Sequence, residues 1–173
     1  LFAKKMGYSY IGICDHSRTA AYAGGLTPER VHAQWAEIDA LNAGLAPFHI
    51  FKGIESDILG DGSLDYDDAL LAGFDFIVAS VHSRMTMASD EMTERILRAV
   101  RSPRMTILGH PSGRRLLARD PYAVEMPRVI AEAIARGVVI EHNCNPERMD
   151  LDWRHLRSAL PSGVPSPLRE GGA

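Results

Sequence analysis

Short apolar runs alternate with amphipathic stretches along most of the chain. The runs are brief and rich in branched and aromatic side chains, which is typical of buried strands. The stretches between them carry apolar residues at helical spacing. This alternation predicts an α/β fold in which helices connect the strands of a parallel sheet. The predicted strands span residues 8–14, 48–54, 74–81, 105–108 and 138–140.

The clearest helix signal follows Thr27, whose hydroxyl can cap a helix that has Pro28 at its first position. From there, one helical face carries Val31, Trp35, Ile38, Leu41 and Leu45. Further helices are predicted over residues 67–72, 91–101, 126–135 and 153–160. About five β/α units result, and their periodicity fits a partial barrel as well as an open doubly wound sheet.

A histidine or a carboxylate follows every predicted strand. Because the carboxyl ends of parallel strands meet at one rim of an α/β fold, we expect these side chains to gather there. Chance placement would account for one or two histidines at the rim, and here there are four. The segments are Asp15-His16-Ser17, Glu55-Ser56-Asp57, His82-Ser83, His110-Pro111 and Glu141-His142-Asn143.

Imidazole and carboxylate together suit Zn²⁺, Mn²⁺ or Fe²⁺. We expect His16, Glu55, His82 and His110 to be the metal ligands. Ligands delivered from several strands can hold two or three ions, which lower the pKa of a bound water and neutralise phosphate oxygens. The residues therefore predict metal-assisted hydrolysis of a phosphoester.

Other polar residues near the rim have two readings each. Asp15 is either a catalytic ligand or a partner that orients an imidazole. His142 is a weaker ligand candidate, because a structural role explains it as well. Arg114 and Arg119 either bind substrate phosphate or form surface ion pairs. The sequence has neither a phosphate-cradling glycine-rich loop nor a nucleophile elbow.

Composition narrows the class of protein. The chain has 173 residues, of which 46% are apolar and 24% charged, as expected for one globular domain. No apolar run is long enough to span a bilayer, so we expect no membrane association. The net charge of −3 does not favour a broad basic face for duplex DNA. Two cysteines, Cys14 and Cys144, are too few for a disulfide scaffold, which favours a reducing cytoplasm.

The two ends of the chain look unusual. The sequence begins at Leu1 without an initiator methionine, and residues 161–173 are rich in proline, glycine and serine. We expect residues 1–160 to form the domain and residues 161–173 to be a disordered or non-native tail. The expectation is that the chain is a piece of a longer protein.

Four segments resemble the polymerase and histidinol phosphatase (PHP) domain, namely residues 10–17 (YIGICDHS), 52–58 (KGIESDI), 79–83 (ASVHS) and 107–111 (ILGHP). Four others are similar to the PHP domain at the C-terminus of bacterial and archaeal family X DNA polymerases. These are residues 61–66 (DGSLDY), 92–96 (MTERI), 109–114 (GHPSGR) and 143–146 (NCNP). The resemblance covers about residues 1–160, and the motifs are specific when taken together.

The resemblance implies a distorted, TIM-like (β/α)7 barrel with a metal cluster at its C-terminal rim. The ligands that it implies are the same His16, Glu55, His82 and His110. The implied cofactors are two or three divalent ions, Mn²⁺ or Zn²⁺, with Fe²⁺ and Mg²⁺ as alternatives. The implied activity is 3′–5′ exonuclease or related phosphoesterase chemistry on DNA 3′ ends, used in DNA repair.

The sequence departs from the family at both ends. The family's first strand ends in a His-x-His pair and its last in an Asp-x-His, and neither is present here. We therefore expect an incomplete barrel that lacks its first and last strands and shows little activity as a fragment. Two alternatives stay open: a stand-alone PHP phosphatase acting on a small phosphomonoester such as histidinol phosphate, and a non-catalytic structural PHP module.

Overall fold

The structure is a computed structural model, and it describes residues 2–159. Helices and parallel strands alternate along the chain, as the hydrophobic pattern predicts. In chain order the elements are α1 (Phe2–Lys5), β1 (Tyr10–His16), the 3-10 turn η1 (Ala21–Ala23), α2 (Pro28–Leu45), β2 (His49–Asp57), α3 (Asp68–Leu71), β3 (Phe76–Ser80), α4 (Ser89–Val100), β4 (Ile107–Leu108), α5 (Met126–Arg136), β5 (Val139–Ile140) and α6 (Trp153–Ala159).

Across the described part of the chain, five strands form one parallel sheet in the order β1-β2-β3-β4-β5. A doubly wound sheet would reverse direction at a switch point in the strand order. The sequential order has no such reversal, and it is the order that strands take along an arc of a barrel. Of the two readings that periodicity left open, the barrel arc is the one that fits. Within residues 2–159 the strands form an open row, so closure into a (β/α)7 barrel stays a prediction.

The strand register decides which side chains share a face. His16 lies opposite Glu55, and Glu55 lies opposite Val78 on the next strand. Because side chains alternate across a strand, Asp57 shares the face of Glu55, and Asp15 lies on the other face from His16. We call the face that carries His16 and Glu55 the inner face. Its two ladders of neighbouring residues are Cys14, Gly53 and Phe76, and His16, Glu55, Val78, Ile107 and Val139.

Close packing on the inner face explains one glycine. A Cβ atom on Gly53 would lie 2.1 Å from Cζ of Phe76, a distance that no real contact allows. Because Gly53 has no side chain, the Phe76 ring can lie across β2 at this position, two residues before Glu55 on the same face. The aromatic ring thereby forms part of the floor below the polar rim.

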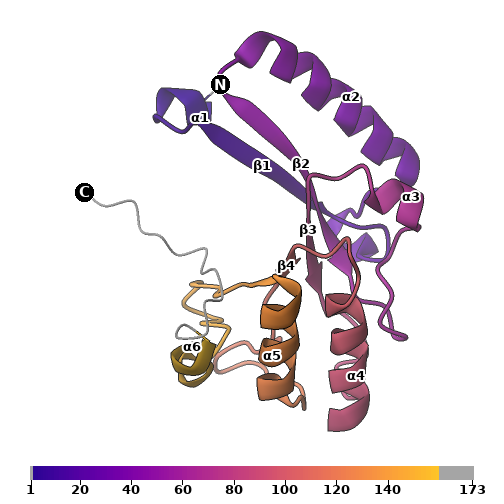
Figure 1. Cartoon of the computed structure of the whole chain (residues 1–173), viewed down its shortest axis with the longest axis vertical. Coiled ribbons are helices and arrows are strands. Elements are labelled where there is room, and N and C mark those ends of the chain that lie inside the picture. The colour runs from indigo at the N-terminus through magenta and orange to yellow at the C-terminus, as the bar shows by residue number, and fades with distance from the viewer. Residues whose placement is uncertain (1, 160–173) are drawn as a thin grey trace.

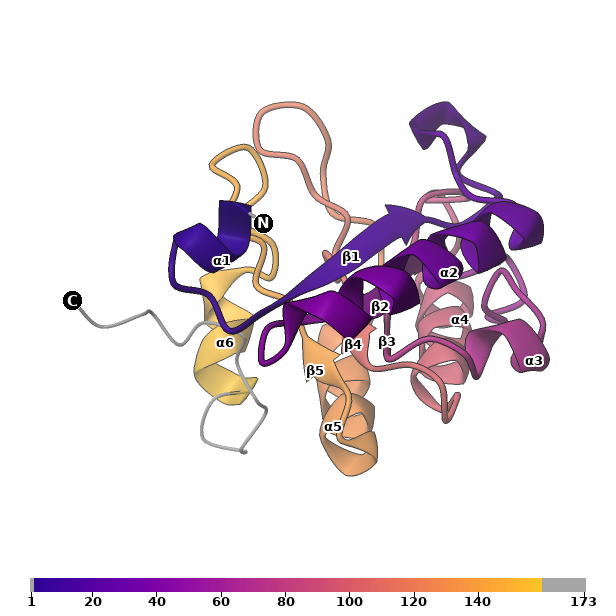
Figure 2. The ribbon, with the colours of Figure 1, turned by 90° about the horizontal axis from the view of Figure 1, so that it is seen from above.

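The opposite, outer face of the sheet carries the main hydrophobic core. Ile54, Ile77 and Leu108 are almost completely buried there, in one cluster with side chains of α4 and α5. The helical members of that cluster include Met92, Ile96, Val100, Val129 and Ala133. Figure 1 shows the helices following one another around the outside of the row of strands, and Figure 2 shows α2 lying along β1 and β2.

The helix cap predicted at Thr27 is confirmed. The Thr27 side chain accepts a hydrogen bond from the Arg30 amide at the start of α2, and Gly137 ends α5 with a φ of 69°. On α2, Val31 and Ile38 are buried as expected, whereas Leu41 is 45% exposed. Leu41 borders an apolar groove with Phe2 and Ile11, so the expected packing face is only partly covered within the described residues.

Some boundaries differ from the sequence prediction. Strands β1 and β2 continue to His16 and Asp57, past the last apolar residue of each run, because the parallel ladder continues through the polar residues. Helix α1 and the turn η1 have no counterpart in the prediction. The expected tail, residues 161–173, lies outside the described residues. Among residues 2–159, no helix is both long and apolar enough to cross a membrane.

Candidate metal centre

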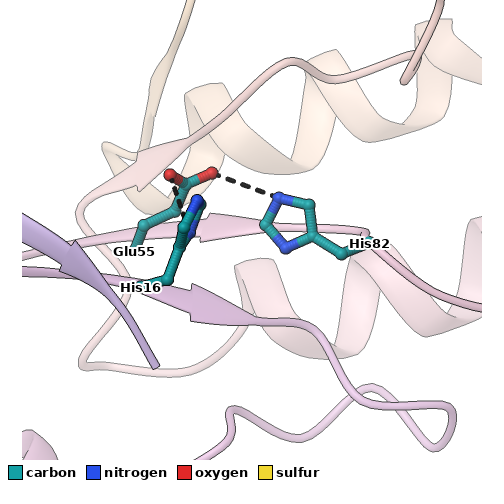
Figure 3. A group of neighbouring side chains, drawn as sticks. All are labelled: His16, Glu55 and His82. Atoms are coloured by element: carbon teal, nitrogen blue, oxygen red, sulfur yellow. Dashed lines mark ion pairs between the residues drawn. The ribbon is translucent and has the colours of Figure 1, made fainter. Parts of the chain in front are cut away.

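Three of the predicted ligands converge above the end of the sheet. His16, Glu55 and His82 each place one ligand atom within 4.8 Å of the others. Figure 3 shows the Glu55 carboxylate joined by dashed lines to both imidazole rings. Its Oε2 lies 3.2 Å from Nδ1 of His16, and its Oε1 lies 3.3 Å from Nε2 of His82. The expected gathering at the strand ends is thus present in the structure.

His110, the fourth predicted ligand, joins the same group. Its Nε2 lies 3.2 Å from Oε1 of Glu55 and 3.2 Å from Nε2 of His82. The residue has a φ of 27°, an uncommon value for a residue other than glycine. Its backbone amide donates a hydrogen bond to Oε2 of Glu141 at 2.5 Å. Glu141 therefore holds the backbone in the conformation that directs the imidazole towards Glu55.

The donor atoms fit a divalent cation. Nδ1 of His110 is buried and has no hydrogen-bond partner among the described residues. Nδ1 of His16 is close to Glu55 but is not aligned for a hydrogen bond with it. Buried polar atoms normally find partners, so an unpartnered His16 nitrogen 3.2 Å from the Glu55 carboxylate is consistent with a metal ligand. Nitrogen and oxygen donors of this kind suit Zn²⁺, Mn²⁺ or Fe²⁺.

The charges of the group are strongly coupled. Burial opposes ionisation of Glu55, but hydrogen bonds from His110 and His82 hold the pKa of its carboxyl well below the usual range. Burial also opposes the charged form of His82, but Asp57 and Glu55 outweigh it and raise the pKa of His82 to about 9. The group therefore gathers positive charge around carboxylates when no metal is bound, and a cation would replace those protons.

Asp57 is a site residue to which the sequence analysis gave no role. Its Oδ1 lies 2.5 Å from Nδ1 of His82, and the residue is only 4% exposed. A carboxylate in this position fixes the tautomer of a metal-binding histidine and leaves Nε2 free for the metal. A signal for it was present in the sequence, because Asp57 lies two positions after Glu55 and so shares its face of the strand.

Asp15 is not part of the group. It pairs in the ladder with Ile54, which belongs to the core on the outer face. Its Oδ2 accepts a hydrogen bond of 2.6 Å from Nε2 of Gln34 on α2. The structure therefore places Asp15 beside a helix, away from the carboxylate of Glu55, and this position does not bring it to a metal held by His16.

The two predicted phosphate-binding arginines are differently placed. Arg114 is only 15% exposed and donates to the carbonyls of Arg148 and Met149 and to Oδ2 of Asp152. It joins two loops, and its donors are occupied. Arg119 donates through Nε to the carbonyl of Gly113, and it borders a cavity of about 490 Å³. Arg119 is the one of the two with donors to spare among the described residues.

The hydrogen bond of His142, the weaker ligand candidate, joins it to a loop. Its Nδ1 is 2.9 Å from the carbonyl oxygen of Leu151, in a loop that pairs Asn143 with Asp150. Asp150 is completely buried and accepts hydrogen bonds from the Ser112 amide and hydroxyl. These contacts fasten the loop after β5 onto the loop that follows His110, and His142 takes part in that fastening.

Comparison with known proteins gives related sequences of two kinds. The chain is 42% identical over 160 residues to the DNA polymerase/3′-5′ exonuclease PolX of Bacillus subtilis (strain 168), a match that covers 92% of this chain and 28% of that protein. It is 30% identical over 102 residues to a probable phosphatase of Syntrophotalea carbinolica, covering 57% of this chain and 40% of that one. A probable phosphatase of Thermoanaerobacter sp. (strain X514) is 27% identical over 146 residues, covering 82% and 54%.

The chain thus spans from about a quarter to about half of the length of these relatives. No protein-family model matches it. The similarity to an exonuclease-bearing polymerase and to probable phosphatases supports a PHP-type region, and it suggests a hydrolase.

Proposed function

We propose that this chain is a metal-dependent phosphoesterase region of the PHP type, and that within the natural protein that carries it this region acts as a 3′–5′ exonuclease on DNA. The observation that carries the proposal is the meeting of His16, Glu55, His82 and His110 at the ends of successive strands. A purely structural module has no physical need for several buried imidazoles around one carboxylate, because each polar group costs free energy to bury. The metal centre accounts for that cost.

The ligand positions define the roles of the chain's own residues. His16, Glu55, His82 and His110 would hold the metal, which lowers the pKa of a bound water and neutralises charge on a phosphate. Asp57 accepts a hydrogen bond from the Nδ1–H group of His82 and keeps Nε2 of that ring directed at Glu55. Glu141 fixes the backbone of His110. Both carboxylates hold ligands in place, so the site is organised before substrate arrives.

A phosphate at the metal needs further positive charge, and Arg148 and Arg119 are the residues we assign to it. Nη1 of Arg148 is buried and has no hydrogen-bond partner within residues 2–159. Burial and the carboxylates of Asp57 and Glu55 raise the pKa of the Tyr22 hydroxyl, and the charges of the two arginines oppose that rise. Both guanidinium groups are therefore within electrostatic reach of a ring that lies 6.3 Å from that of His16. Arg114 instead fixes the backbone of Arg148, through the hydrogen bond to its carbonyl. An arginine fork matches phosphate oxygens well.

Two observations favour DNA over a small ester as substrate. The relative with 42% identity is named a polymerase and 3′-5′ exonuclease, and its match covers nearly the whole of this chain. The phosphatase matches are lower in identity and shorter. The second candidate function is hydrolysis of a small phosphomonoester, which the same ligands would support and which the names of those relatives favour.

The test uses the natural protein that carries this chain, loaded with Mn²⁺. Release of nucleotides from a 3′-labelled oligonucleotide and release of phosphate from histidinol phosphate are measured in parallel. We expect His82→Ala to slow nucleotide release at least ~10-fold with folding retained. The matched control is His32→Ala, an exposed histidine on α2, which should leave the rate unchanged.

Each outcome decides between the candidates. Nucleotide release that depends on His82 supports the exonuclease. Phosphate release alone, with the same dependence, supports the small-ester phosphatase. Equal rates for the His82→Ala variant and the unsubstituted protein would contradict the metal-centre assignment, and absence of both activities would favour the structural module.

A further inference from the structure

Tyr22 is an exposed aromatic residue beside the metal centre. It lies in η1, the turn that follows β1, and it is 75% exposed. Its ring centroid is 6.3 Å from that of His16 and 6.4 Å from that of His82. The ring therefore stands next to two ligands while most of its surface faces solvent. Neither the motifs nor the proposed catalytic roles account for it.

The turn that carries Tyr22 is firmly anchored. The neighbouring Ala20 is fully buried, and the amide of Ala20 donates to the carbonyl of Ser17, which is also buried. Thr19 donates to Oδ2 of Asp65 through its amide at 2.8 Å and through its hydroxyl at 2.9 Å. Asp65 itself is only 1% exposed. The base of the turn is thus held by buried contacts, and the ring keeps its place over the site without packing into the core.

A ring as exposed as that of Tyr22 contributes little to folding stability, because an apolar ring stabilises the fold only when it is removed from water. The ring is left with a free face beside the position where the proposed phosphodiester would bind. A substrate bound there presents the group attached to its phosphate at the rim. In DNA that group is a nucleoside, whose base is a flat aromatic surface.

We propose that Tyr22 stacks against the base of the 3′-terminal nucleotide and so makes the site selective for nucleotides. This inference rests on the proposed function and names the substrate class of the same site. Stacking is tolerant of sequence because every base has a π face, so the residue would select for a base without selecting among bases. The hydroxyl is not needed for such a contact, and phenylalanine should replace tyrosine.

The experiment compares two oligonucleotides of identical sequence with the Mn²⁺-loaded natural protein. One ends in an ordinary nucleotide, and the other ends in an abasic residue at the 3′ position. Single-turnover release of the terminal residue is measured for each. We expect Tyr22→Ala to slow release of the ordinary nucleotide about 10-fold and that of the abasic residue less than about 2-fold. Tyr22→Phe should retain the original rates, and so should Tyr8→Ala, an exposed tyrosine before β1.

Three results would overturn the proposal. Equal slowing of both substrates by Tyr22→Ala would show that the residue supports the fold or the chemistry. Equal loss with Tyr22→Phe would assign the effect to the hydroxyl. Unchanged rates with Tyr22→Ala would show that no stacking occurs. Failure of the proposed function is a separate result, since the unsubstituted protein would then release neither terminal residue, and the stacking role would fall with it.

Discussion

The Oδ1 atom of Asp57 lies 2.5 Å from Nδ1 of His82, and the other ring nitrogen of His82 lies 3.3 Å from Glu55. One imidazole thus links a buried carboxylate behind it to the ligand group in front of it. The arrangement follows from β2, where Glu55 and Asp57 are two positions apart and share the inner face. A single strand thereby supplies both a metal ligand and the residue that orients another.

The role of Asp57 can be tested against that of Asp15. Asp57→Asn should weaken metal binding by about 10–100-fold, because the amide no longer fixes the tautomer of His82. Asp15→Asn also removes a carboxylate near the end of a strand, but this one lies on the outer face. The variant should therefore weaken metal binding by less than about 2-fold. Calorimetric titration of the metal-free variants with Mn²⁺ or Zn²⁺ measures both. Equal losses in the two variants would refute the division of roles.

The raised pKa of His82 makes the stability of the metal-free protein depend on pH. The folded state holds the proton of His82 up to about pH 9, whereas the unfolded chain releases it near pH 6.5. The resulting stabilisation is therefore fully present below pH 6.5, and it is lost as pH rises through 9. The expected loss in unfolding free energy is up to about 3 kcal/mol.

Urea unfolding in the presence of a chelator, at pH 6 and pH 9.5, measures this loss. His82→Gln is the control, because it keeps a polar side chain but cannot be protonated. The difference in stability between the two proteins should shrink as pH rises. A difference that stays constant with pH would show that Asp57 and Glu55 do not stabilise the charged imidazole.

Arg95 is a positioning residue that can be separated from the chemistry. It is 3% exposed, and its guanidinium donates to the carbonyls of Ile58, Leu59 and Ser83, which lie just beyond Asp57 and His82. Arg95→Met should lower the unfolding free energy by about 3 kcal/mol, because several acceptors lose their partner. Arg98→Ala, on the exposed face of the same helix, should cost about 0.5 kcal/mol. Chemical denaturation measures both, and similar small losses would contradict the assignment.

Substitution of Arg148 should affect phosphate binding, whereas substitution of Arg114 should affect the stability of the fold. Arg148→Gln should weaken binding of inorganic phosphate to the Mn²⁺-loaded protein by about 10-fold and leave metal affinity unchanged, because a hydrogen bond to a charged group contributes about 1.5–3 kcal/mol. Arg114→Gln should instead lower thermal stability, because its donors join two loops. Phosphate binding that is insensitive to Arg148→Gln would remove that residue from the site.

The alternation of apolar runs and helical spacing was sufficient to predict every strand within residues 2–159, including the edge strand β1, in which no residue is buried. Periodicity does not report the order of strands, however. The choice between barrel arc and doubly wound sheet came only from the pairing of β1 with β2, β2 with β3, and so on. The turn η1 lies in a stretch rich in alanine and glycine without periodicity, so the sequence carried no signal for Tyr22.

The candidate site was predictable to the level of strand ends and no finer. His16, Glu55, His82 and His110 each follow an apolar run, and the structure brings all four together. For adjacent polar residues such as Asp15 and His16, only the register decides which one faces inward, because a shift of one residue exchanges the faces. The hydrogen-bond donors of Arg114 are used by residues more than thirty positions away, and local sequence does not indicate such contacts.

Metal binding by the chain itself tests the central claim most directly. The chelator-treated protein is titrated with Mn²⁺ and, separately, with Zn²⁺, alongside the Glu55→Gln variant. We predict at least one ion bound per chain, and a loss of affinity of 10-fold or more in the variant, because Glu55 is the carboxylate that His16, His82 and His110 all approach. Absence of binding, or binding that Glu55→Gln leaves unchanged, would contradict the account.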